Sequence, residues 1–157
     1  MNIFNSLKKI PFFHGLTDDE LKKIAVITKE KKMGANSIIF EENMPGDSMF
    51  IIKSGSVKVS KSIGKDRQKT LSILGEGEFF GEMALLDGEP RSASSIAAED
   101  VELLVINKDD FIDLLTNNGP LAVKFFITII KVFSMRLRQT DDNFKNLLIK
   151  YVKEGNR

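Results

Sequence analysis

Residues 37–60 read SIIFEENMPGDSMFIIKSGSVKVS, and they hold three short apolar runs that are separated by turn residues. The runs are rich in β-branched and alternating apolar residues, a pattern that favours strands over helices. Pro45-Gly46-Asp47 and Ser54-Gly55 supply the turn signals between them. Short strands at this spacing are typical of antiparallel β structure.

Three further runs of the same kind lie toward the C-terminus and complete a set of six. The predicted strands are Ser37–Glu41, Met49–Lys53, Ser56–Ser60, Thr70–Leu74, Ser92–Ala98 and Val101–Ile106. The alternating period begins near Lys29 and ends at Asn107, and both flanks have a helical period. We therefore expect an α+β, mainly β fold, in which residues 29–107 form an antiparallel jelly-roll β-barrel.

Residues 1–28 are predicted to form short helices in front of the barrel. Asn2 can cap a first turn, and Pro11 interrupts that helix. Thr17-Asp18-Asp19-Glu20 has the spacing of a capping box, which opens a second helix that continues through Ile27. The barrel is thus expected to follow an N-terminal helical segment.

Residues 108–157 return to a helical period. Asn107 is the expected N-cap of a helix over Lys108–Asn117. Pro120 then opens a final helix, which is predicted to span residues 120–153. Because globular helices average about 11–12 residues, a helix of this length needs a surface on which to pack.

Apolar residues recur along the final helix at alternating steps of three and four, as in a heptad seam. The seam comprises Val123, Phe126, Ile130, Phe133, Leu137, Thr140, Phe144, Leu147 and Tyr151. This pattern predicts a parallel homodimer through the helix of residues 120–153, with the start of the helix packing on its own barrel. The alternative is a single helix that folds back on its own domain.

The composition argues against several functional classes. The chain of 157 residues carries 23 basic and 22 acidic residues, for a formal net charge of +1, without the basic stripe of a nucleic-acid binder. His14 is the single histidine and cysteine is absent, which disfavours a metal centre, a haem sensor and a Ser–His–Asp hydrolase. No apolar run reaches the roughly 20 residues that span a membrane. We therefore expect a cytoplasmic protein with no cofactor and no membrane contact.

Residues 79–94, FFGEMALLDGEPRSAS, differ from the strands around them. A strand runs into Gly81, helix-favouring residues follow, and a Gly-Glu-Pro turn leads to Arg91 and the next strand. Glycine lets the main chain approach a ligand closely, and the first N–H groups of a helix can face an anion. The guanidinium of Arg91 suits a phosphodiester, and the carboxylate of Glu82 can accept from a sugar hydroxyl. The segment therefore predicts a site for a ribose and its phosphate.

The run FGEMALLDGEPRSAS resembles the phosphate-binding cassette of cyclic nucleotide-binding domains. That family includes the bacterial catabolite activator protein and the regulatory subunits of cAMP-dependent protein kinase. Residues 42–59, from Glu42 through Pro45-Gly46-Asp47 to Val59, are similar to the glycine-punctuated barrel strands of the family. With the flanking helices, the resemblance covers nearly the whole chain, and it implies a module that binds a cyclic mononucleotide.

The resemblance implies a role for each matching residue. The expected ligand-binding residues of the cassette are Gly81, Glu82, Met83, Ala84, Arg91 and Ser92. The main-chain N–H groups of Gly81 and Ala84 would face the cyclic phosphate. Arg91 and Ser92 would contact the phosphate oxygens, and Glu82 would accept from the ribose 2′-OH. Without the resemblance, Glu82 and Arg91 are an ordinary surface ion pair and Ser92 is a plain strand residue.

In dimeric relatives, polar residues of the long helix meet the base near the subunit interface. Thr140 and Asp141 lie in a similar segment, and Thr140 occupies the seam. Asp141 could accept from the exocyclic amine of adenine but would oppose O6 of guanine, which favours cAMP over cGMP. Ser92 instead favours cGMP, because a hydroxyl at this position contacts the amine of guanine in some relatives. A polar seam residue such as Thr140 can also simply set the helix register.

Together these features predict a regulatory sensor that binds cAMP, or less favourably cGMP, and that has no catalytic activity. Transcription regulators of the family continue from the long helix into a winged helix-turn-helix. The sequence stops at Arg157, so DNA binding is not predicted. The alternative function is a dimeric scaffold whose barrel holds no ligand. The sequence does not identify the downstream protein partner.

Overall fold

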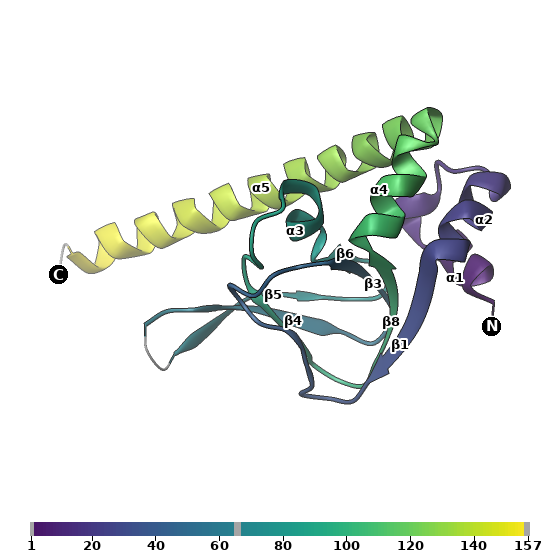
Figure 1. Cartoon of the computed structure of the whole chain (residues 1–157). Coiled ribbons are helices and arrows are strands. Elements are labelled where there is room, and N and C mark those ends of the chain that lie inside the picture. Colours follow the sequence, from purple (N-terminus) through teal and green to yellow (C-terminus); the bar gives the residue numbers. More distant parts are fainter. Residues whose placement is uncertain (1, 65–66, 156–157) are drawn as a thin grey trace. The chain divides into compact units, whose positions relative to one another are not determined.

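The computed structural model describes residues 2–64 and 67–155 (Figure 1). The strands are β1 (Thr28–Met33), β2 (Ile38–Phe40), β3 (Ser48–Ser54), β4 (Val57–Ser62), β5 (Gln68–Leu74), β6 (Phe79–Phe80), β7 (Ser94–Ala97) and β8 (Val101–Asn107). The helices are α1 (Ile3–Lys9), the 3₁₀-helix η1 (Pro11–Phe13), α2 (Asp18–Ile27), α3 (Glu82–Asp87), α4 (Lys108–Thr116) and α5 (Gly119–Gly155). The chain divides into two compact units between Asn118 and Gly119.

The first unit contains two antiparallel sheets. Among its described residues, each sheet has four strands, in the orders β1-β8-β3-β6 and β2-β7-β4-β5. Helices α1, η1 and α2 precede the strands, α3 interrupts them between β6 and β7, and α4 follows them. The antiparallel jelly-roll fold with flanking helices, which the sequence predicts, is confirmed.

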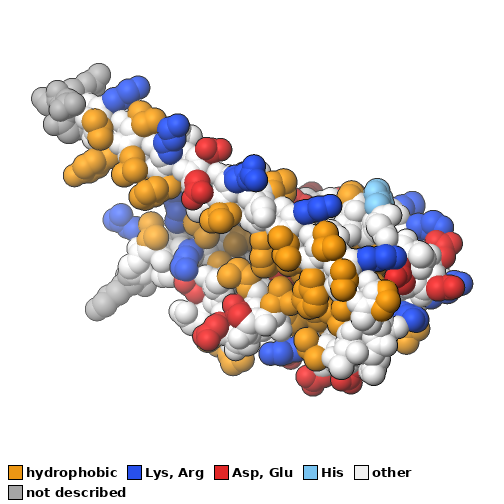
Figure 2. All heavy atoms as spheres, turned by 90° about the horizontal axis from the view of Figure 1, so that it is seen from above, with side chains coloured by type: hydrophobic (Ala, Val, Ile, Leu, Met, Phe, Trp, Pro, Cys, Tyr) orange, Lys and Arg blue, Asp and Glu red, His pale blue; other side chains and the backbone are white. Residues whose placement is uncertain are grey.

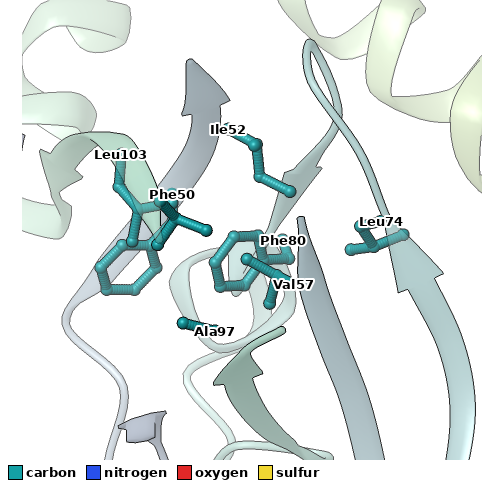
Figure 3. Close-up of a cluster of buried hydrophobic side chains, with 8 residues drawn as sticks. Phe50, Ile52, Val57, Leu74, Phe80, Ala97 and Leu103 are labelled. Carbon is teal, nitrogen blue, oxygen red and sulfur yellow. The ribbon is translucent and has the colours of Figure 1, made fainter. Parts of the chain in front are cut away.

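The two sheets enclose a cluster of buried apolar side chains (Figure 3). Phe50 of β3 and Phe80 of β6 stack with their ring centroids 5.2 Å apart. Val57 of β4 and Leu103 of β8 belong to the same cluster. Because alternate residues of a strand point to the same side, the alternating sequence pattern supplies this core.

The apolar pattern does not predict β1 as a strand. Its sequence TKEKKM has charged residues at 29–32, and all four are exposed. The strand lies at the edge of its sheet and pairs with β8 alone. An edge strand can carry charges on its exposed positions without loss of pairing, so hydrophobic alternation is a poor guide to such a strand.

The predicted N-terminal caps are present. Asn2 caps α1 by accepting a hydrogen bond from the main chain of that helix. Thr17 and Glu20 form both halves of the capping box of α2, with main-chain to side-chain distances of 2.7 and 3.3 Å. Phe12 of η1 packs against Phe79 of β6, with ring centroids 4.6 Å apart, which joins the N-terminal helices to the barrel.

Asn107 precedes α4 as the sequence predicts, but its side chain does not cap that helix. Its carboxamide oxygen instead accepts from the hydroxyl of Ser48 on the neighbouring strand β3, at 3.2 Å. The N–H of Lys108 donates to the main-chain oxygen of Asp47 at 2.7 Å. Asn107 therefore occupies the predicted N-cap position, but a bond to β3 takes the place of a side-chain cap and fixes the start of α4 against the barrel.

Helix α5 has 37 residues and begins one position before the predicted start. Figure 2 shows hydrophobic side chains in a row along the part of this helix that leads to the C-terminus. Its large exposed side chains at seam positions are Val123, Phe126, Ile130, Leu137, Phe144, Leu147 and Tyr151. No helix in the described part of the chain is both long enough and apolar enough to cross a membrane.

Glu102 on β8 bridges two lysines, and this arrangement predicts a pH effect on stability. Lys32 and Lys53 donate to its carboxylate at 2.6 and 2.9 Å and lower the pKa of Glu102 to about 2. A carboxyl with a lowered folded-state pKa stabilises the fold above its unfolded pKa of about 4.3, and this contribution disappears as the pH falls toward 2. Between these pH values, the melting temperature of the wild type should fall more steeply than that of Glu102→Gln. Thermal melts followed by circular dichroism at several pH values measure the difference. The variant Glu76→Gln, at an exposed position, is the control and should follow the wild type. If the melting temperatures of the wild type and Glu102→Gln fall equally with pH, the prediction is wrong.

Candidate functional site

Arg91 lies in the loop between α3 and β7, and it is buried, with 4% of its surface exposed. Its main-chain N–H donates to the oxygen of Met44 and its main-chain oxygen accepts from Asn43, each at 2.8 Å. These two bonds join the loop to the segment between β2 and β3. The main chain at Arg91 is therefore fixed on both sides, and its side chain enters the barrel from a defined position.

The guanidinium of Arg91 connects three elements of the barrel. Its Nη1 donates to the main-chain oxygen of Gly81 at 2.7 Å, and its Nη2 donates to the main-chain oxygen of Ser48 at 2.8 Å. The Cζ atom lies 4.1 Å from the centre of the Phe40 ring and 5.8 Å from that of Phe50. Main-chain dipoles and aromatic faces both attract a cation, so the guanidinium is held in one orientation.

The Nε–H of Arg91 is buried and has no hydrogen-bond partner within residues 2–64 and 67–155. A buried donor without an acceptor costs about 1–3 kcal/mol. Burial lowers the pKa of Arg91, and the nearby carboxylates of Asp47 and Glu82 oppose this effect. A desolvated cation with an unused donor fits an incoming anion, because the anion would supply both an acceptor and a compensating charge.

Two glycines let the main chain pack closely around this guanidinium. Gly81 has a φ of +75°, and a Cβ atom there would lie 2.7 Å from Nη1 of Arg91. At Gly46, a Cβ atom would lie 2.5 Å from Cβ of Ala84 and 2.7 Å from Nε of Arg91. A side chain at either position would displace the arginine or the cassette, so both glycines are needed for this geometry.

The structure brings the predicted cassette residues together at α3. Glu82 and Ala84 are buried in the first turn of that helix, whereas Met83 is exposed. Ser92 is exposed as well, and its hydroxyl lies 3.7 Å from the sulfur of Met83. Glu82 and Arg91 are both buried, so they do not form the exposed surface pair that was the alternative.

Thr140 and Asp141 belong to the second compact unit, on α5, and both are exposed. The Thr140 hydroxyl donates to the main-chain oxygen of Arg136 within the same helix, at 3.0 Å. Contact of these two residues with a bound base stays a prediction.

Several residues around Arg91 are absent from the sequence prediction of the site. Phe40 and Ser48 contact the guanidinium directly, Gly46 leaves room for it, and Asp47 contributes charge. The sequence does single out the turn Pro45-Gly46-Asp47, which resembles the barrel strands of the family. This resemblance indicates a barrel turn, and it does not indicate that the turn borders the ligand site.

The chain also matches a known family over the barrel and the cassette. Residues 30–118, more than half of the chain, match the family described as the cyclic nucleotide-binding domain. The chain belongs to this family. The cyclic nucleotide-binding match contains all of residues 79–94, whereas Thr140 and Asp141 lie outside it.

Individual relatives agree with this assignment. The chain is 33% identical to the cGMP-dependent protein kinase egl-4 of Caenorhabditis briggsae, over 96% of this chain and 22% of the relative. It is also 33% identical to the cyclic AMP receptor protein of Thermus thermophilus, over 86% of this chain and 61% of the relative. A crystal structure of a cyclic nucleotide-binding domain from Methylobacillus flagellatus matches with a TM-score of 0.79 and 28% identity, over 90% of this chain and 80% of that one. The chain thus spans less than two thirds of these two curated relatives.

Proposed function

We propose that this domain binds a cyclic mononucleotide, with the phosphate at Arg91. The observation that carries the proposal is the buried Nε–H of Arg91, which lacks a partner in the described part of the chain. A cyclic phosphate presents exocyclic oxygens and one negative charge, both of which this guanidinium needs. Membership of the cyclic nucleotide-binding domain family supports the same ligand class.

The cassette, residues 79–94, would divide the ligand between its residues. The guanidinium of Arg91 would pair with the exocyclic oxygens, and main-chain N–H groups at Gly81 and Ala84 would donate to them. The exposed hydroxyl of Ser92 would add a donor at the edge of the phosphate. The carboxylate of Glu82 would accept from the ribose 2′-OH, and its negative charge would strengthen this hydrogen bond.

We favour cAMP over cGMP as the ligand. A carboxylate at Asp141 would accept from the exocyclic amine of adenine and would repel O6 of guanine, while Thr140 would meet the base beside it. The hydroxyl of Ser92 favours guanine, so the two signals compete. The names of the relatives include a cGMP-dependent kinase and a cyclic AMP receptor protein, which supports the class of ligand rather than the base.

Calorimetric titration of the full chain with cAMP and with cGMP tests the proposal. We expect both nucleotides to bind, with the lower Kd for cAMP. Adenosine, which has the base and the ribose without the phosphate, is the control and should bind far more weakly. If neither cyclic nucleotide binds at millimolar concentration, the proposal is wrong. The dimeric scaffold, which the exposed apolar side chains of α5 favour, would then be the better function.

Replacing Glu82 by glutamine should weaken the binding of cAMP but not that of 2′-deoxy-cAMP. The carboxylate is buried, with 4% of the residue exposed, and hydrogen bonds to charged groups contribute about 1.5–3 kcal/mol. The amide oxygen of glutamine still accepts, as in a neutral hydrogen bond, so only about 1–1.5 kcal/mol is lost and the Kd for cAMP should rise roughly 5- to 15-fold. Glu89→Gln, on the exposed turn of the cassette, is the matched control. Equal losses for cAMP and 2′-deoxy-cAMP would rule out a role in ribose recognition.

We propose a regulatory role without catalysis for this domain. Ligand bound at the cassette would favour one arrangement of α5 over another, which requires different affinities for the ligand in the two arrangements. We assign to this chain neither contacts with DNA or a membrane nor a cofactor, and we place its action in the cytoplasm. The barrel of residues 29–107 would sense the ligand, and residues 108–157 would report it.

We also propose that α5 forms a parallel homodimer. Its seam side chains Leu137, Phe144 and Tyr151 are 62%, 62% and 77% exposed in the single chain, and a partner helix would cover them. Phe144→Glu should shift the protein from dimer to monomer in sedimentation equilibrium. Asn146→Glu, on the side of the helix away from the seam, should leave the dimer intact. A wild-type monomer at high concentration would contradict this proposal.

A further inference from the structure

Each of the two sheets has two edge strands, which present main-chain N–H and C=O groups that no neighbouring strand pairs. In the part of the chain that the structure describes, these edges are β1 and β6 in one sheet and β2 and β5 in the other. Natural proteins protect such edges by keeping them short, by charging them or by adding bulges. The four edges of this barrel can be compared on that basis.

Three of the four edges are protected. Strand β6 has two residues, and β2 has three, with a register shift between Ile38 and Phe40. Strand β1 is longer, but Lys29, Glu30, Lys31 and Lys32 place four charges in succession along it. None of these edges offers an extended apolar strand to another chain.

Strand β5 has weaker protection, namely one charged residue, Lys69, and a register shift against β4 that leaves Leu71 without a partner. It pairs with β4 as its neighbour in the sheet (Figure 1). It is seven residues long, and each of its first six residues is exposed. Two of these are large apolar residues, Leu71 with 56% and Ile73 with 65% of the surface exposed. An exposed edge strand of this length with apolar side chains pairs readily with another extended segment.

The β4–β5 hairpin is also positively charged. Lys61 on β4 and Lys69 on β5 occupy directly opposite positions, an arrangement in which like charges destabilise a strand pair. Lys58 lies opposite the exposed Ile73, and Arg67 precedes β5. Glu42 approaches Lys61 to 3.8 Å, which compensates one of these charges. The surface next to the open edge thus combines apolar side chains with an excess of cations.

We propose that the edge of β5 binds an extended acidic segment of a partner protein by strand addition. The main chain of the segment would pair with β5, its carboxylates would face Lys61 and Lys69, and alternate apolar side chains would cover Leu71 and Ile73. This proposal is independent of nucleotide binding.

The charge distribution favours this occupant over two others. A second copy of β5 would add another set of lysines to a surface that already holds opposed cations. An anionic lipid surface would satisfy the lysines but would leave the unpaired main-chain groups of β5 without partners. An acidic strand satisfies the charges, the apolar side chains and the main chain together.

A labelled eight-residue peptide of alternating glutamate and valine is a suitable probe, and the matched peptide with lysine in place of glutamate is its control. With the chain of residues 1–157, we expect the acidic peptide to bind and the basic peptide to bind at least tenfold more weakly. Amide resonances of residues 68–74 should shift in NMR spectra. The variant Lys61→Glu/Lys69→Glu should reverse the preference, whereas Lys29→Glu/Lys31→Glu on β1 should leave it unchanged.

Four outcomes would overturn the proposal. The first two are equal binding of the two peptides and a preference for the acidic peptide that persists in Lys61→Glu/Lys69→Glu. The other two are peptide-induced amide shifts that lie outside β5 and a lack of binding by either peptide. If the β5 resonances shift with protein concentration in the absence of peptide, the occupant is a second copy. Binding to vesicles of phosphatidylserine and phosphatidylcholine without peptide binding would identify a lipid surface instead.

Discussion

Replacing Arg91 by alanine should raise the Kd for cAMP by roughly 30- to 4,000-fold, because removing one partner of a buried charged pair costs about 2–5 kcal/mol. The guanidinium is 4% exposed and is fixed by bonds to the main-chain oxygens of Gly81 and Ser48. A phosphate bound beside it would lose its compensating charge in the variant. Calorimetric titration of both proteins with cAMP measures the change directly.

Two variants separate loss of the phosphate contact from loss of the fold. Arg91→Lys keeps the charge but lacks the planar fork, so it should bind cAMP with an affinity between those of the wild type and Arg91→Ala. Arg67→Ala removes an exposed arginine and should bind as the wild type does. A folded Arg91→Ala protein with unchanged affinity would refute the assigned role of Arg91.

Replacing Gly46 by alanine should weaken cAMP binding and the fold together. The added Cβ would lie 2.5 Å from Cβ of Ala84 and 2.7 Å from Nε of Arg91, so the cassette or the guanidinium must move. Extra atoms in a tightly packed site cost about 1–3 kcal/mol. We expect a lower melting temperature and, since the arginine is displaced, an affinity for cAMP that is at least about tenfold lower.

Gly75→Ala provides the control for this prediction. Apart from its two chain neighbours, no described residue has a heavy atom within 4 Å of a Cβ at Gly75, and its φ is not in the left-handed region. Its melting temperature and its affinity for cAMP should therefore stay close to those of the wild type. If Gly46→Ala binds cAMP as tightly as Gly75→Ala does, close packing at residue 46 is not needed for the site.

The fold follows from local sequence patterns to a large extent. Apolar alternation indicates β4 and β8, and a continuous apolar run, which is buried throughout, indicates β3. Apolar patterning fails at β1, which is held by main-chain pairing with β8 while its charged side chains face solvent. Asn107 lies at the predicted N-cap position, but its side chain does not cap α4, since it bonds to Ser48, which is distant in the sequence.

Some residues of the candidate site can likewise be predicted from local sequence, whereas others cannot. Gly81, Glu82 and Arg91 can be predicted because they lie within one short segment whose residue types suit a ribose phosphate. The contacts of Arg91 with Ser48 and Phe40 join residues more than forty positions apart, and only the packing of the barrel brings them together. Local patterns therefore identify the charged groups, whereas the surroundings that desolvate and orient them depend on the tertiary structure.

NMR observation of the Arg91 Nε–H group during a cAMP titration measures the proposed phosphate contact itself. The resonance is assigned by its absence from the spectrum of Arg91→Lys, because lysine has no Nε–H group. On saturation with cAMP, the signal should move downfield and exchange more slowly with solvent, and adenosine should not produce this change. A signal that stays in place while cAMP saturates the protein would mean that the phosphate binds elsewhere.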